Sequence, residues 1–179
     1  MERRAESGER LAAVTTDLVA QVVRERGRIT LTLQGHSMVP TLSPGTRIQV
    51  QRCDPATLRP GQVVAFERAG RIVAHRVMRV ESGPDGLAFV TKGDRGYSAD
   101  DAVISADCLI GLVTEARDPE TGACLPLAEP TLARFWVRWG RVQTALGRRK
   151  HWIPQRIYPF CRRWFDRVFQ AWLRARGAG

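Results

Sequence analysis

Between Ile29 and Glu115 the apolar residues recur at every second position, in short runs interrupted by glycine- and proline-rich turns. A period of two is the spacing of side chains on one face of a β-strand, whereas a helix needs 3.6. Six runs show this pattern: 29–33, 47–51, 62–67, 71–80, 87–91 and 109–115. Between them lie Ser-Pro-Gly at 43–45, Arg-Pro-Gly at 59–61, Ala-Gly at 69–70 and Gly-Pro-Asp-Gly at 83–86. The sequence therefore predicts a compact, mostly antiparallel β domain.

The segments on both sides of this domain show the helical period instead. The stripe before it ends near Gly27 and contains Leu11, Val14, Leu18 and Val22. The first stripe after it contains Leu132, Phe135, Trp136, Trp139, Val142 and Leu146, and a second contains Trp164, Phe165, Val168, Phe169 and Trp172. We therefore predict a mainly β (α+β) fold. Its parts are an amphipathic N-terminal helix at 1–28, the β domain at 29–116, a linker at 117–130 and a basic aromatic helical tail at 131–179.

The positive charge of the chain is concentrated in this tail. The formal net charge is +10, yet 12 of the 28 Lys and Arg and only one acid, Asp166, lie after residue 130. Arginines around an aromatic stripe are typical of helices that bind an anionic membrane surface, so residues 131–179 are a candidate membrane-binding segment. The competing interpretation is that both stripes pack against the β domain or each other. Nucleic acid is a weaker candidate partner, because no recognised binding motif accompanies the charge.

The N-terminus and the cysteines limit the compartment and the chemistry. Residues 1–10 lack the apolar stretch of a signal peptide, and no segment has the ~20 apolar residues of a membrane-spanning helix. The four cysteines form no C-x-x-C pair and no cluster with metal-ligand spacing; they are Cys53, Cys108, Cys124 and Cys161. We therefore expect free thiols, no metal and no cofactor, in a cytoplasmic protein that is at most peripheral to a membrane.

Three short motifs carry groups suited to catalysis. Ser37 lies in "GHSMVPT", His75 lies on a predicted strand in "RIVAHRVMRV", and Asp94 and Asp100 lie in "TKGDRGYSADD". A serine hydroxyl is a weak nucleophile at neutral pH, and a neighbouring imidazole can activate it while a carboxylate orients the imidazole. Each residue alone also has an ordinary structural explanation, as a turn or core residue. Their spacing does not show that they meet in space.

Taken in order, "SMVPT", "PGQVVAFE", "IVAHRV", "TKGD" and "IGLV" resemble signal peptidase I, of the superfamily that also holds the self-cleaving SOS repressors. The resemblance runs from about residue 30 to 115. With histidine in "HRV", it is to the archaeal and endoplasmic-reticulum type rather than to the type with a lysine base. It implies a serine endopeptidase that cleaves a peptide or protein. Ser37 would be the nucleophile, His75 the general base, Asp100 the orienting acid and Asp94 a supporting acid.

The chain departs from the family's pattern in two places that bear on activity. A membrane-spanning helix usually precedes the serine motif, and here a polar-faced helix at 8–26 takes its position. Many members carry a hydroxyl at the position of Gly35 that helps to bind the oxyanion, which leaves the backbone N–H of Ser37 as the named donor. The oxyanion site is therefore expected to be weaker than in those members.

Two other functions compete with the endopeptidase interpretation. One is a non-catalytic β domain that acts as a binding or scaffold module through its basic helices. The other is a self-cleaving protein of the SOS-repressor type. It fits less well, because only 36 residues precede Ser37 and they contain no Ala-Gly or Cys-Gly pair.

Overall fold

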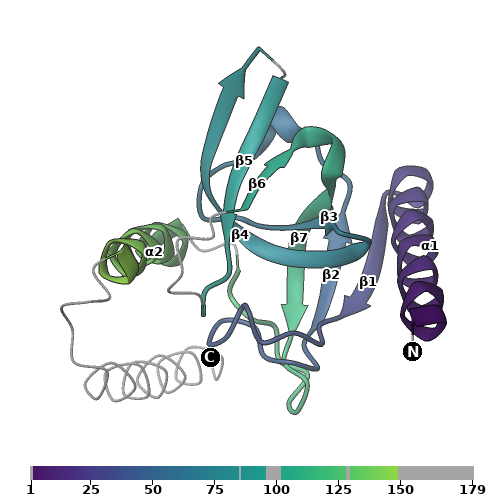
Figure 1. Ribbon diagram of the computed structural model, residues 1–179. Helices are drawn as coiled ribbons and strands as arrows, with labels where there is room; N and C mark the ends of the chain where they lie inside the picture. The colour runs from purple at the N-terminus through teal and green to yellow at the C-terminus, as the bar shows by residue number, and fades with distance from the viewer. Residues whose placement is uncertain (1, 85, 96–101, 128–129, 149–179) are drawn as a thin grey trace.

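A computed structural model describes residues 2–84, 86–95, 102–127 and 130–148 of the chain. Its strands form one curved sheet, with helix α1 beside the β1 edge and helix α2 on the other side of the molecule (Figure 1). The strand order is β1-β2-β7-β3-β4-β5-β6, and each neighbouring pair is antiparallel. The fold class predicted from the sequence, an antiparallel β domain with a helix before and after it, is confirmed.

The strands follow the predicted runs closely. They are β1 (Arg28–Thr32), β2 (Arg47–Gln51), β3 (Val63–Arg68), β4 (Arg71–Gly83), β5 (Gly86–Lys92), β6 (Ala102–Ser105) and β7 (Leu109–Arg117). Two short 3₁₀ turns are η1 (Pro55–Thr57) and η2 (Ala106–Cys108). The sequence did not predict β6, because four residues are too few to show an alternating pattern.

A two-residue turn sets the register between β3 and β4. Ala69 and Gly70 have φ values of 51° and 70°, the positive values that a type I′ hairpin turn requires. The twist of this turn matches the right-handed twist of the flanking strands, so the strands pair from Arg68 and Arg71 onward without a bulge. This register fixes the position of His75, which pairs with Val64 of β3.

Both faces of the sheet centre are covered by apolar side chains. On β3, Val63 and Ala65 belong to one core and Val64 and Phe66 to the other, as the alternation of a strand requires. The first core also contains Val19, Val23, Met38, Leu42, Ile48 and Val50. The second contains Leu58, Val77, Phe89 and Ile104. Because residues 63–66 of β3 are buried on both faces of the sheet, this part of the strand is a continuous apolar run.

Helix α1 (Glu2–Arg26) packs with a different face from the one that the apolar stripe predicted. Val14 and Leu18 of that stripe are 64% and 58% exposed. The buried face is one helical row of Thr16, Val19 and Val23. Its threonine hydroxyl donates to the carbonyl of Gly70 at 2.9 Å, so a polar residue is satisfied inside the contact. A pattern that counted only apolar residues could not identify this face.

Helix α2 (Pro130–Arg148) contains the first aromatic stripe of the tail. Trp136 is buried at 2% exposure, whereas Phe135 and Val142 are 40% and 46% exposed. The helix therefore packs against the sheet through one face and leaves apolar and basic residues on the other. The second stripe, at 164–172, lies outside the described residues.

The segment predicted as a linker also contacts the domain. Arg117 and Cys124 form an isolated antiparallel bridge, and Leu127 is buried in the first core. Cys53, Cys108 and Cys124 are free thiols, while the remaining cysteine lies outside the described residues. Among the helices that the structure describes, none has the length and apolar character that crossing a membrane requires.

Candidate active site

Ser37 lies at the surface, in the loop that joins β1 to β2. Buried side chains of Met38 and Leu42 anchor this loop, and the Leu42 N–H donates to the Met38 carbonyl at 2.9 Å. Within the described part of the chain, neither the N–H nor the hydroxyl of Ser37 donates a hydrogen bond. The loop therefore presents a serine with two donors that can reach a substrate.

His75 lies on β4, and its ring packs edge-on against Phe66 with 5.9 Å between the ring centroids. Burial lowers the pKa of His75 from 6.5 to about 4, because desolvation disfavours the charged ring. The negative charge of Asp94 opposes this shift in pKa, whereas Arg68 and Lys92 add to it. The imidazole is therefore neutral at pH 7 and can accept a proton, as a general base must.

Gly93, which follows β5, lies against both the serine and the histidine. A Cβ added to it would lie 2.6 Å from the carbonyl oxygen of Ser37, 3.1 Å from Cβ of Ser37 and 3.2 Å from Nε2 of His75. The distance between those two side-chain atoms therefore cannot exceed the sum of the last two values. Among the described residues no hydrogen bond joins the two side chains, and such bonds are often long in ligand-free enzymes. The structure brings these two predicted residues together, and only glycine leaves room between them.

Asp94 is buried beside this pair and bound to a cation. Arg76 donates from Nε to Oδ1 at 2.9 Å and from Nη2 to Oδ2 at 2.7 Å. The hydroxyl of Thr41 donates to Oδ2 at 2.6 Å. The side chains of Arg76 and Asp94 are only 2% and 3% exposed, so water does not compete for these bonds. Asp94 thus connects β4 to the loop that carries Ser37; its part in catalysis stays a prediction.

Asp100, the acid predicted to orient His75, lies outside the described residues. Nδ1 of His75 is buried and has no hydrogen-bond partner within the described part of the chain. A carboxylate bonded to this nitrogen would keep the proton on Nδ1 and leave Nε2 as the acceptor for the serine proton. It would also raise the pKa of His75 toward neutral pH. The role of Asp100 stays a prediction: its carboxylate would accept a hydrogen bond from Nδ1 of His75.

The sequence interpretation missed Gly93, Arg76 and Thr41. Arg76 follows the predicted base between the apolar pairs Val73-Ala74 and Val77-Met78, and a charged residue buried in such a segment must have a partner. The acid in "TKGD" is the natural candidate for that partner. The close approach of Gly93 had no comparable signal, because it depends on how the sheet curves.

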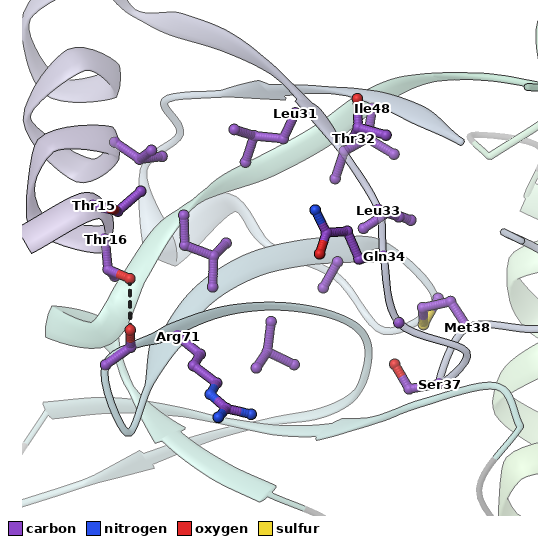
Figure 2. A pocket seen from close by; sticks show the side chains of 16 residues that line it. Thr15, Thr16, Leu31, Thr32, Leu33, Gln34, Ser37, Met38, Ile48 and Arg71 are labelled. Atoms are coloured by element: carbon purple, nitrogen blue, oxygen red, sulfur yellow. Dashed lines mark hydrogen bonds between the residues drawn. The ribbon is translucent and has the colours of Figure 1, made fainter. Parts of the chain in front are cut away.

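A cavity of about 670 Å³ extends from Ser37 to helix α1 (Figure 2). Residues 31–35 line one side and residues 70–74 line the other, while Thr15 and Thr16 of α1 lie at the far end. Its apolar side chains are Val19, Leu31, Leu33, Met38, Ile48, Ile72, Val73 and Ala74. The serine therefore lies at one end of an apolar groove.

Strand edges without a neighbouring described strand line both sides of this groove. β1 pairs with β2 alone, at one end of the sheet. The Arg71–His75 part of β4 pairs with β3, and its pairing with β5 begins only at Arg76. Backbone groups on such edges can bind an extended peptide as an added strand. The lining stretches 31–35 and 70–74 are each five residues long, so a peptide of about four or five residues could lie extended along them.

Comparison with known proteins gives a limited similarity to a peptidase. No family profile matches the chain. A region of 71 residues is 37% identical to signal peptidase I W of Bacillus subtilis (strain 168). The match covers 38% of this chain and 37% of that protein, so the chain spans little more than a third of the length of this relative. A signal-peptidase-like relationship is supported over that region.

Proposed function

We propose that this protein is a serine endopeptidase that cleaves a peptide or protein in a signal-peptidase-like reaction. The observation that carries the proposal is the approach of Ser37 and His75 to one point beside Gly93. The histidine is largely buried and neutral at pH 7, and the serine lies at the end of an apolar groove. The partial similarity to signal peptidase I W supports the same class of reaction.

The chemistry follows from these positions. Nε2 of His75 accepts the proton of the Ser37 hydroxyl as Oγ attacks the carbonyl carbon of the scissile bond. The imidazolium returns that proton to the leaving amine, and an ester links Ser37 to the acyl part of the substrate. Water, activated by the same neutral imidazole, then hydrolyses the ester and releases the serine.

The oxyanion that forms on the carbonyl needs a donor at the serine. The backbone N–H of Ser37 is the donor that we propose, because it donates to no other described residue. Gly35 has no hydroxyl to add a second donor. Loss of one such donor costs about 3 kcal/mol of transition-state stabilisation in studied proteases, so we expect slow turnover compared with enzymes that have both.

The groove points to an extended, apolar substrate segment. Its two strand edges would bind the peptide backbone, and its aliphatic lining would take small apolar side chains. A binding module could use the same edges, but it has no need for a partly buried neutral histidine beside an exposed serine. The catalytic function therefore accounts for more of the observed geometry.

We also propose that the outer face of α2 binds the surface of an anionic membrane. Phe135 and Val142 are partly exposed there, and Arg134, Arg138 and Arg141 are exposed around them. Such a face suits insertion of the apolar side chains among anionic head groups. The burial of Trp136 limits this role to the outer face of the helix.

Peptide hydrolysis with variants of the two residues tests the catalytic proposal. The protein would be incubated with a defined mixture of unstructured peptides, and cleavage would be followed by mass spectrometry. Ser37→Ala and His75→Ala should each abolish cleavage without changing the thermal unfolding midpoint by more than a few degrees. His36→Ala is the matched control, because this neighbouring histidine is exposed and lies outside the groove. Full activity in Ser37→Ala would end the hydrolase interpretation.

A further inference from the structure

Trp136 of α2 covers the buried cation that holds Asp94. The guanidinium carbon of Arg76 lies 5.4 Å from the centre of the Trp136 ring, a distance typical of a cation–π contact. Arg76 uses its other edge as well, since its Nη1 donates to the carbonyl of Gly61 at 2.6 Å. The N–H groups along the edge of the guanidinium thus donate hydrogen bonds, and the Trp136 ring lies over its plane.

Two glycines allow α2 to lie close to the β domain, one in the domain and one in the helix. A Cβ on Gly61 would lie 2.5 Å from the Cβ of Ala133, and a Cβ on Gly140 would lie 2.5 Å from the methyl carbon of Met78. Ala133, Trp136 and Gly140 lie three and four residues apart, on one face of the helix. This face of α2 therefore contacts the β domain through three residues, and Trp136 is the middle one.

The contacts continue from Arg76 to the nucleophile. Arg76 bonds both oxygens of Asp94, and Asp94 also accepts from Thr41, four residues beyond the serine. The residues on either side of Asp94 touch Ser37 directly. Gly93 lies against its carbonyl oxygen, and the N–H of Arg95 donates to that oxygen at 2.8 Å. The position of Asp94 therefore determines where the backbone of Ser37 lies.

We propose that Trp136 is a positioning residue for the active site, acting through Arg76 and Asp94 to fix the backbone of Ser37 against His75. This inference rests on the peptidase function proposed above. It assigns helix α2 to the catalytic unit and gives the buried tryptophan a role separate from membrane binding.

The physical reason is the burial of the ion pair. The flat guanidinium fits between the carboxylate, the Gly61 carbonyl and the indole face, which excludes water from all three contacts. A smaller side chain at 136 would admit water and allow Arg76 to tilt away from Asp94. A shift of ~1 Å in the segment 93–95 would move the Ser37 backbone equally, and displacements of that size lower catalytic rates by ~100-fold.

The test compares Trp136→Leu with Leu18→Ala, which shortens an exposed apolar side chain of α1 that does not line the groove. For peptide hydrolysis we expect kcat of Trp136→Leu to fall about 10- to 100-fold, with KM changed by less than about threefold, because the groove itself does not include α2. Trp136→Phe keeps an aromatic face and should recover a large part of kcat. Leu18→Ala should match the wild type.

A second measurement does not depend on peptidase activity. The NMR titration of His75 should show the same pKa, lowered by burial, in the wild type and in Leu18→Ala. Of the charged groups near the ring, Asp94 raises this pKa, while Arg68 and Lys92 lower it. In Trp136→Leu, Asp94 is less neutralised by Arg76, so the pKa should move upward toward 6.5.

The outcomes separate the two proposals. A wild type without hydrolysis, in which Trp136→Leu still shifts the His75 titration, removes the peptidase function but keeps the structural coupling. Wild-type kcat and an unchanged His75 titration in Trp136→Leu would overturn the inference while leaving the peptidase function intact. Where Trp136→Leu does not fold, Trp136→Met decides, because it keeps more side-chain volume without an aromatic face: a lower kcat with an upward shift of the His75 pKa supports the inference, and wild-type values of both refute it.

Discussion

Replacing Gly93 by alanine should disable the site with a single methyl group. The added carbon would lie 2.6 Å from the Ser37 carbonyl oxygen, whereas optimal non-bonded contacts lie at ~3.5 Å. It would also be 3.1 Å from Cβ of Ser37 and 3.2 Å from Nε2 of His75. The backbone oxygen cannot rotate away as a side chain could, so the serine loop must move by a large part of an ångström. We expect a ~100-fold loss of catalytic rate and a loss of about 1–3 kcal/mol in the free energy of unfolding.

The assay is the rate at which a fluorophosphonate probe labels the protein, measured beside urea unfolding. Gly83→Ala is the matched control, because a Cβ at Gly83 meets no atom within 4 Å and that glycine lies far along β4 from the site. Gly83→Ala should keep the labelling rate and stability of the wild type. If Gly93→Ala is labelled at the wild-type rate while folded, the close approach of Ser37 and His75 is not as described, and the proposed geometry fails.

Three further predictions concern stability, the acids and the membrane. Burial lowers the pKa of His75 to about 4, so between pH 6.5 and 4 the unfolded chain binds a proton that the folded chain does not. The free energy of unfolding should therefore fall by up to about 3 kcal/mol as the pH drops through that window, and His75→Gln should remove this part of the decrease in urea titrations. Asp100→Asn should slow peptide cleavage more than Asp94→Asn if Asp100 orients the imidazole, and a larger loss at Asp94 would show that holding the Ser37 loop in place matters more than orienting the imidazole. The full chain should co-sediment with phosphatidylserine vesicles at low salt and less at high salt; no binding at low salt would leave α2 as a packing element alone.

The turn between β3 and β4 offers a test of the fold. Ala69 has a φ of 51°, which costs an alanine roughly 1 kcal/mol and costs asparagine less. Ala69→Asn creates the Asn-Gly pair that type I′ turns prefer, and it should raise the free energy of unfolding by about 0.5–1 kcal/mol in urea. Destabilisation would show that the turn differs from the one described.

Much of the fold could be predicted because the information lies in neighbouring residues. The alternation of apolar side chains identified six strands, and Ala-Gly at 69–70 identified a tight hairpin. The buried face of α1 could not be predicted, since it includes Thr16, whose hydroxyl is satisfied by a residue 54 positions away. β6 was missed because a four-residue strand has no recognisable period of its own.

The reactive groups of the site could be predicted from the sequence, whereas the residues that hold them in position could not. Ser37 and His75 were identified because their residue types and surrounding motifs match a known reaction, and the structure brings them together. The pairing of Arg76 with Asp94 spans 18 positions, and the bond from Thr41 to Asp94 spans 53. Trp136 comes from beyond the β domain altogether. Such contacts follow from the curvature of the sheet and the docking of a helix, which no local pattern encodes.

Catalysis by Ser37 and His75 is tested most simply by mapping where a serine-directed fluorophosphonate labels the protein. The wild-type protein would be labelled at pH 7, digested, and mapped by mass spectrometry. We expect one adduct, on Ser37, that forms far more slowly in His75→Ala and at the normal rate in His36→Ala. An adduct on another residue, or labelling of Ser37 that is unaffected by His75→Ala, would contradict it.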